Sequence, residues 1–90
     1  MFKLDVYEKR TEESTSITYF AVKFTASYVY SIDHAISIVE MLGEIEGIRD
    51  RNGDLIKLSC TEDPKTGSVS CSLNSNDYKA EITTVDSPHT

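Results

Sequence analysis

SIDHAISIVEMLGEIEG, residues 31–47, has the pattern of the one long helix in a chain of 90 residues. At about 100° per residue, most of its apolar side chains gather on one broad face. These side chains are Ile32, Ala35, Ile36, Ile38, Val39 and Leu42. Runs that alternate apolar and polar residues flank the segment on both sides, so we expect one helix packed on strands.

Residues at both ends of the segment support this helix. Ser31 suits the N-cap position, and Asp33 places a carboxylate in the first turn, at the positive end of the helix dipole. We expect the helix to run from about residue 32 to residue 42 and to end at Gly43 in a left-handed conformation. The letters EIEG offer the alternative of one more turn, to Gly47.

A period of two before the helix predicts a hairpin. One alternating run begins at Phe2, a second covers residues 19–24, and the polar residues 10–15 between them are expected to form the loop. A second strand that continued unbroken to the helix would be far longer than the usual range of about 3–10 residues. We therefore expect a bend or bulge near Ala26 or Ser27.

Further strands are predicted after the helix. Asn52-Gly53 lies between two potential strands and indicates a hairpin. Alternating runs then follow at residues 56–60, 69–73 and 78–82, separated by turn residues. Such alternation is typical of antiparallel strands with one buried face.

These patterns predict a small α+β domain of the order β-β-α-β-β-β-β. We expect an antiparallel sheet of about five to six strands with the helix packed on its apolar face. A single domain is assigned to residues 1–86, and residues 87–90 are expected to fray.

Length and charge restrict the classes of function. A domain of this size buries about 60–65% of the surface of its unfolded chain, which weighs against a deep substrate cavity and against an enzyme. The chain has 15 acidic and 9 scattered basic side chains, with a formal charge of −6. We therefore expect no direct binding to nucleic acid or membranes, and a protein with a basic surface as the partner. No apolar run resembles a signal peptide or reaches about 20 residues, which indicates a cytoplasmic location.

Side chains suited to metal binding or nucleophilic attack are few. A zinc site would need Cys60, Cys71, His34 and His89 together, and their spacing matches no zinc motif, so neither a metal nor a cofactor is expected. The two cysteines become cross-strand neighbours if their loop has four residues. We expect them as thiols in a reducing cytosol, with a disulfide as the alternative. His34 has no acid or nucleophile fixed beside it by spacing, so no catalytic residue is assigned.

Carboxylates line the outer face of the predicted helix. Asp33, Ser37, Glu40 and Glu44 fall together there, Glu46 follows, and the segment contains no lysine or arginine. Like charges four residues apart destabilise a helix by about a few tenths of a kcal/mol. The row is either a solvated face or an imitation of a phosphate backbone that occupies a basic groove.

Tyrosines are the second candidate for an interface. Tyr7, Tyr19, Tyr28 and Tyr30 are expected outside the core-facing positions. Exposed tyrosines are favoured at interfaces because they bury much area at little entropic cost. The alternative is that they pack under the helix or against the loop.

In general character, a short acidic chain without catalytic motifs is similar to the small inhibitor proteins of bacterial viruses and mobile elements, including anti-CRISPR proteins and DNA mimics. The first hypothesis is a non-enzymatic binding protein that inhibits or modulates a larger, basic, nucleic-acid-processing partner. Its candidate contact residues are Asp33, Glu40, Glu44, Glu46, Tyr19, Tyr28 and Tyr30. The alternative is a structural or assembly protein that forms homodimers or larger oligomers through sheet edges and exposed tyrosines.

Overall fold

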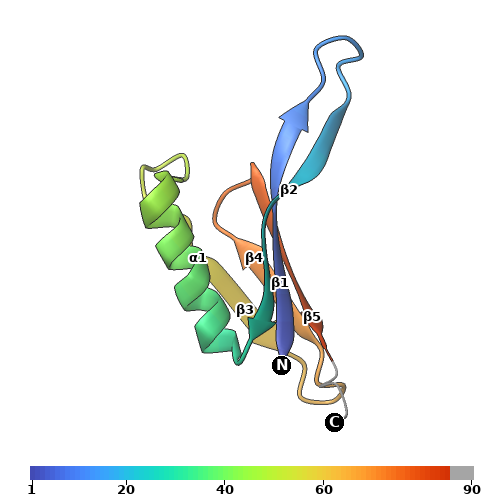
Figure 1. Cartoon of the computed structure of the whole chain (residues 1–90), viewed down its shortest axis with the longest axis vertical. Coiled ribbons are helices and arrows are strands. Elements are labelled where there is room, and N and C mark those ends of the chain that lie inside the picture. Colours follow the sequence, from blue (N-terminus) through green and yellow to red (C-terminus); the bar gives the residue numbers. More distant parts are fainter. Residues whose placement is uncertain (86–90) are drawn as a thin grey trace.

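Five strands and one helix make up the described part of the chain, residues 1–85 of a computed structural model (Figure 1). In chain order they are β1 (Phe2–Thr11), β2 (Thr18–Val29), α1 (Ile32–Glu46), β3 (Leu58–Glu62), β4 (Val69–Leu73) and β5 (Tyr78–Thr84). The predicted combination of antiparallel strands with one helix is confirmed. The strand count agrees only roughly, because the strands form two sheets, β2-β1-β5 and β3-β4, instead of one.

The hairpin expected around Asn52-Gly53 is reduced to a tight loop. Arg49 and Leu55 form one isolated antiparallel bridge, and the described chain has no further strand between α1 and β3. The Oδ1 atom of Asp50 holds the loop, because it accepts hydrogen bonds from the amides of Asn52 and Asp54 at 2.9 and 3.0 Å. The predicted order β-β-α-β-β-β-β is therefore corrected to β-β-α-β-β-β.

The side chain of Asn74, directly after β4, takes the place of a strand partner for this loop. Its Oδ1 atom accepts a hydrogen bond from the amide of Lys57 at 2.7 Å. Its Nδ2 atom donates to the Leu55 carbonyl at 3.2 Å and to the Asp50 carboxylate at 2.9 Å. An asparagine can do this because its amide carries both a donor and an acceptor, as a backbone peptide group does.

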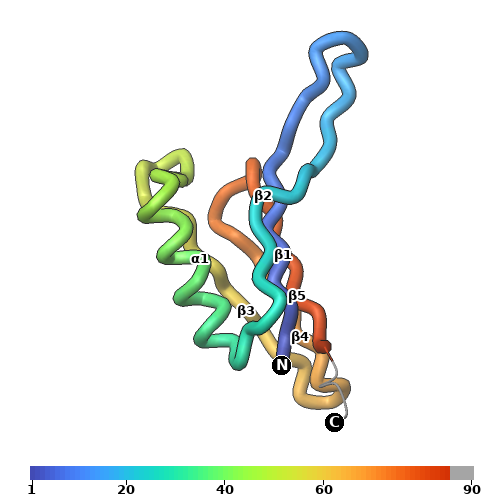
Figure 2. Tube along the Cα trace, in the orientation of Figure 1, coloured from blue at the N-terminus to red at the C-terminus, as the bar shows by residue number. Residues whose placement is uncertain are grey.

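β1 and β2 form a long hairpin whose loop end projects beyond the rest of the molecule (Figures 1 and 2). The bulge predicted near Ala26 or Ser27 is confirmed, since β2 advances three residues from Ala26 to Val29 while β1 advances two. A second register shift, which the sequence did not indicate, leaves Lys23 without a partner in β1. Bulges bend a strand and increase its twist, which turns the outer half of the hairpin away from the core.

The helix begins and ends at residues that the sequence indicated. Ser31 is the N-cap, and its side chain accepts a hydrogen bond from the amide of His34 at 3.1 Å. The left-handed end is Gly47, with φ 67°, so the longer alternative is confirmed and an end at Gly43 is wrong. Gly43 is instead a buried position inside the helix, where a Cβ atom would lie 2.7 Å from the Cγ2 atom of Ile56.

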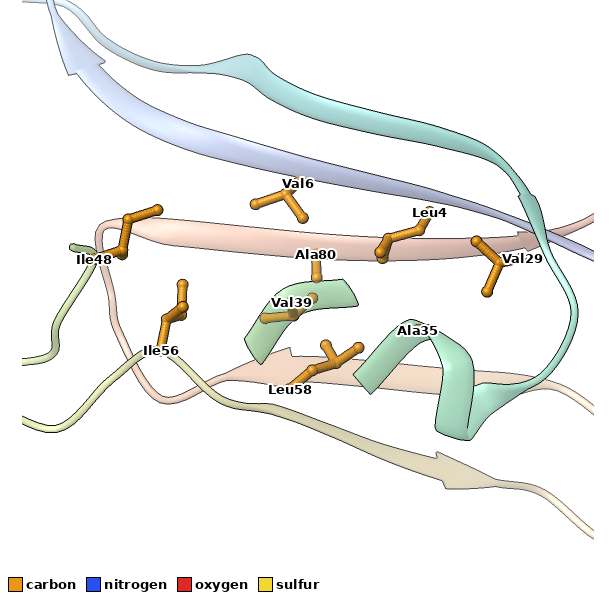
Figure 3. Packing of buried hydrophobic residues seen from close by; sticks show 9 residues of the cluster. All are labelled: Leu4, Val6, Val29, Ala35, Val39, Ile48, Ile56, Leu58 and Ala80. Atoms are coloured by element: carbon orange, nitrogen blue, oxygen red, sulfur yellow. The ribbon is translucent and has the colours of Figure 1, made fainter. Parts of the chain in front are cut away.

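A small apolar core lies between the three-stranded sheet and a layer made of α1 and β3 (Figure 3). Its buried members are Leu4, Val6, Val29, Ala35, Val39, Ile48, Ile56, Leu58 and Ala80. Of the six apolar side chains predicted to face the core from the helix, only Ala35 and Val39 are fully buried. The other four, Ile32, Ile36, Ile38 and Leu42, are half-buried, because the fully packed side of α1 is the narrower stripe of Ala35, Val39 and Gly43.

The two cysteines form a disulfide, which corrects the expectation of free thiols. Cys60 and Cys71 are direct register partners in β3 and β4, and their Cα atoms are 4.1 Å apart. The amide of Asp63 donates to the carbonyl of Ser68 at 2.8 Å, so residues 64–67 form the four-residue loop that makes the two cysteines cross-strand neighbours. Direct opposition in a hairpin brings the sulfur atoms into bonding range.

Two further expectations concern the C-terminal residues and membrane spans. Residues 86–90, which contain the predicted tail and His89, lie outside the described residues. Among residues 1–85, the single helix is too short and too polar to cross a bilayer.

Candidate protein-binding surface

The outward side of α1 carries the predicted carboxylates. Asp33, Glu40 and Glu44 are all exposed, and we call these three residues the acidic row. Within residues 1–85, none of them takes part in an ion pair. Glu40 and Glu44 border a shallow hollow of about 210 Å³ that Lys57 also lines, but the lysine forms no ion pair with either of them. The acidic row therefore presents three exposed carboxylates without an ion-pair partner in residues 1–85.

Glu46, predicted as part of the same surface, lies elsewhere. Its carboxylate is 4.0 Å from the Nζ atom of Lys23 on β2, and the same nitrogen lies 3.7 Å from Glu8. Two residues beyond Glu44, the helix has turned by about 200°, which directs Glu46 towards the sheet. This ion pair links the C-terminal end of α1 to the Lys23 bulge and leaves Glu46 outside the acidic row.

A second row of side chains on α1 is apolar and largely exposed. Met41 is 59% exposed and Ile45 is 75% exposed, and with the half-buried Ile38 they form what we call the apolar row. Large apolar side chains at such exposure are normal singly, but neighbouring ones on one face indicate a contact surface. Sequence reasoning did not assign Met41 and Ile45 to any site. Their spacing of three and four residues from Ile38 was the signal that could have found them.

An apolar hollow adjoins this row on the side of β2. It has a volume of about 250 Å³ and is lined by Phe24 of β2 and by four side chains of α1. The four are Ile38, Met41, Leu42 and Ile45. The hollow faces solvent with almost no polar lining, so it can accept apolar side chains but offers no group for chemistry on a substrate.

The predicted tyrosines are exposed, but the fold does not gather them. Tyr19 is 46% exposed and lies in the projecting part of the β1–β2 hairpin, whereas Tyr28 is 70% exposed and lies at the other end of β2. Nine residues of strand separate the two, which corresponds to about 30 Å. They cannot both belong to the surface around α1.

Tyr30 lies at the N-terminal end of the helix surface. It is 72% exposed, and its ring stacks on His34 with 5.5 Å between ring centroids and 15° between planes. Its backbone amide donates a hydrogen bond to the Nδ1 atom of His34 at 3.1 Å. His34 thus has a local structural role, and it lies four residues before Ile38, in line with the apolar row.

Tyr7 has a perturbed ionisation. Partial burial, followed by the negative charges of Glu81 and Asp5, raises the pKa of Tyr7 above its usual value of 10.0. Its hydroxyl donates to the Oε2 atom of Glu81 at 3.3 Å, and Lys79 lies 6.0 Å from the centre of its ring. A phenol with a raised pKa is a weaker acid and stays protonated at neutral pH, so this cluster does not activate Tyr7 as a nucleophile.

No other arrangement of reactive side chains stands out in residues 1–85. They contain no group of three or more histidine, cysteine, aspartate or glutamate residues placed to hold a metal ion. Of the four potential zinc ligands, Cys60 and Cys71 are bonded to each other and His34 accepts from the backbone.

Comparisons with protein-family models, with curated proteins and with solved structures gave no match. Function must therefore be inferred from the surface of this chain.

Proposed function

We propose that this chain is a non-enzymatic acidic binding protein that docks through the outward side of α1 on a larger protein with a basic surface. The observation that carries the proposal is the acidic row, three exposed carboxylates without an ion-pair partner in residues 1–85, directly beside exposed apolar side chains. Carboxylates without an ion-pair partner attract a basic surface, and burial of the neighbouring apolar side chains stabilises the complex.

The partner class follows from the shape of the charge. From Asp33 to Glu44 the acidic row extends about 16 Å along the helix at 1.5 Å per residue. A line of negative charge can enter a groove that is built for a phosphate backbone and displace the same counterions that nucleic acid displaces. We therefore assign a nucleic-acid-processing protein as the partner, with inhibition or modulation by occupancy of its groove, as a DNA mimic would act.

A second candidate is self-assembly through the free edge of β2. β2 has 12 residues and pairs only with β1 in the described chain, so its outer edge is unpaired. Phe20 and Val22 on this strand are 44% and 58% exposed. An unpaired edge with apolar side chains is a template for a second strand.

The test uses capture from the cells that make the protein. We expect a nucleic-acid-processing protein to be retained by the natural chain and lost by the variant Asp33→Asn/Glu40→Gln/Glu44→Gln. The matched control Glu13→Gln/Glu62→Gln/Asp77→Asn removes the same charge from other exposed positions and should retain it. Retention by the acidic-row variant would contradict the proposal, and self-association alone would favour the second candidate.

A further inference from the structure

The apolar row has the spacing of a helix-packing seam of which the core uses only Ile38. From His34, steps of four, three and four residues lead to Ile38, Met41 and Ile45, the alternation found at the a and d positions of coiled coils. The fully buried residues of α1 are Ala35, Val39 and Gly43, and of the apolar row Ile38 alone packs against the core, whereas Met41 and Ile45 are exposed. The helix therefore has two apolar sides, one packed in the core and one that is free at Met41 and Ile45.

The surroundings of the seam leave room beside β2. Figure 2 shows that the N-terminal end of α1 lies close to β2 and that the helix diverges from β2 towards the C-terminal end of α1. In that interval the apolar hollow between Phe24 and the apolar row opens to solvent. Apolar side chains from an added helix can enter such a hollow as knobs enter holes.

The charge beside the seam favours a basic helix over a second copy of this chain as the partner. On the helical wheel the acidic row lies on the flank of the seam opposite the hollow, so a helix seated on the seam places one of its own flanks against Glu40 and Glu44. A second copy of this chain carries a charge of −6, and an antiparallel pair of α1 helices would bring like flanks together. A helix with lysine or arginine on that flank compensates the row instead.

We infer that the partner contributes a basic amphipathic helix, which packs its apolar side on the apolar row and directs lysine or arginine to the acidic row. This inference rests on the proposed function and specifies the contact that carries it. The seam from His34 to Ile45 is about 16 Å long, so three turns of the partner helix suffice to cover it.

The test uses defined peptides as probes. One is a 15-residue peptide with leucine at alternating steps of three and four residues and lysine at the remaining positions; a second has the same composition in a permuted order without a helical stripe. Fluorescence anisotropy measures affinity, and NMR chemical shifts locate the contact. We expect the first peptide to bind and to shift the signals of Phe24, Met41 and Ile45. The second peptide should bind with an affinity at least about tenfold lower.

Variants of the protein separate apolar packing from charge. Met41→Gln/Ile45→Gln should lower the affinity for the first peptide by about tenfold or more. Val22→Gln, a change at a similarly exposed residue on β2, should leave this affinity unchanged. Both positions changed on α1 are exposed, so the thermal unfolding of the variant should match that of the natural chain. The acidic-row variant should reduce the on-rate and the salt dependence of binding.

Several results would overturn the inference. The first two are equal binding of the permuted peptide and unchanged binding by Met41→Gln/Ile45→Gln. Chemical shift changes confined to the edge of β2 would indicate an added strand instead. Self-association that Ile45→Gln abolishes would indicate a second copy of this chain. If the captured partner is retained by Met41→Gln/Ile45→Gln and lost by the acidic-row variant, the helix contact is wrong while the proposed function stands. If the acidic-row variant retains it, the proposed function itself is wrong.

Discussion

Replacement of Gly43 by alanine tests how closely α1 approaches the loop before β3. An added Cβ atom would lie 2.7 Å from the Cγ2 atom of Ile56, where carbon atoms normally rest at about 3.5–4.0 Å, so one side must move by about 1 Å. Ile56 is only 1% exposed and cannot swing into solvent. Overpacking of this kind costs about 1–3 kcal/mol, and the better helix propensity of alanine returns about 1 kcal/mol. We expect Gly43→Ala to lower the free energy of unfolding by up to about 2 kcal/mol.

A double-mutant cycle isolates the contact. Ile56→Leu removes the Cγ2 branch at nearly constant volume, so Gly43→Ala should be neutral or stabilising by up to about 1 kcal/mol in that background. Gly47→Ala serves as the control, because its φ of 67° makes alanine costly while nothing lies within 4 Å of its added Cβ atom. Its effect should be the same with either residue at position 56. Urea unfolding followed by circular dichroism measures all five variants and the natural chain. An increase in stability for Gly43→Ala in the natural background would refute the reasoning.

Three further predictions concern the rest of the fold. Asn74→Ala should lower the free energy of unfolding by about 1–2 kcal/mol in urea, because it leaves the loop without its side-chain donor and acceptor; no change would show that water replaces them. Reduction of the disulfide, whose cysteines are 11 residues apart in sequence, should cost about 3 kcal/mol from loop entropy, measured by unfolding with and without reductant. Glu81→Gln should lower the pKa of Tyr7, read from tyrosinate absorbance against a Tyr7→Phe reference. Because the folded state favours the neutral phenol, its contribution to stability is present below about pH 10 and lost as the pH rises through the raised pKa.

Local features of the fold followed from the sequence because short-range chemistry determines them. Ser31 and Gly47 bound the helix through their own backbone preferences, and the opposition of Cys60 and Cys71 follows from a four-residue loop. Features that depend on distant segments did not follow. The split between β4 and β5 and the position of Gly43 against Ile56 depend on how elements far apart in sequence meet.

The candidate surface shows the same division. Periodicity placed Asp33, Glu40 and Glu44 on one side of the helix correctly, since they are exposed together. It could not tell which part of a wide apolar arc packs inward, because that depends on the sheet and on β3. The sequence predicts that Ile38 and Leu42 face the core together with Ala35 and Val39, and it assigns no role to Met41 and Ile45, whose exposure is visible only in the fold.

The two packing sides of α1 allow stability and binding to be varied separately. Val39 is fully buried, so Val39→Ala should destabilise the fold by about 1–3 kcal/mol through lost burial and a cavity. Ile45, at 75% exposure, loses little on truncation in the free protein, so Ile45→Ala should change unfolding by less than about 0.5 kcal/mol. For the affinity of a complex formed through the seam, we expect the larger effect from Ile45→Ala, because it removes an apolar contact with the partner. Val39→Ala leaves the outer side of the helix intact. If Ile45→Ala destabilises the free protein as much as Val39→Ala does, the apolar row belongs to the core and no free seam exists.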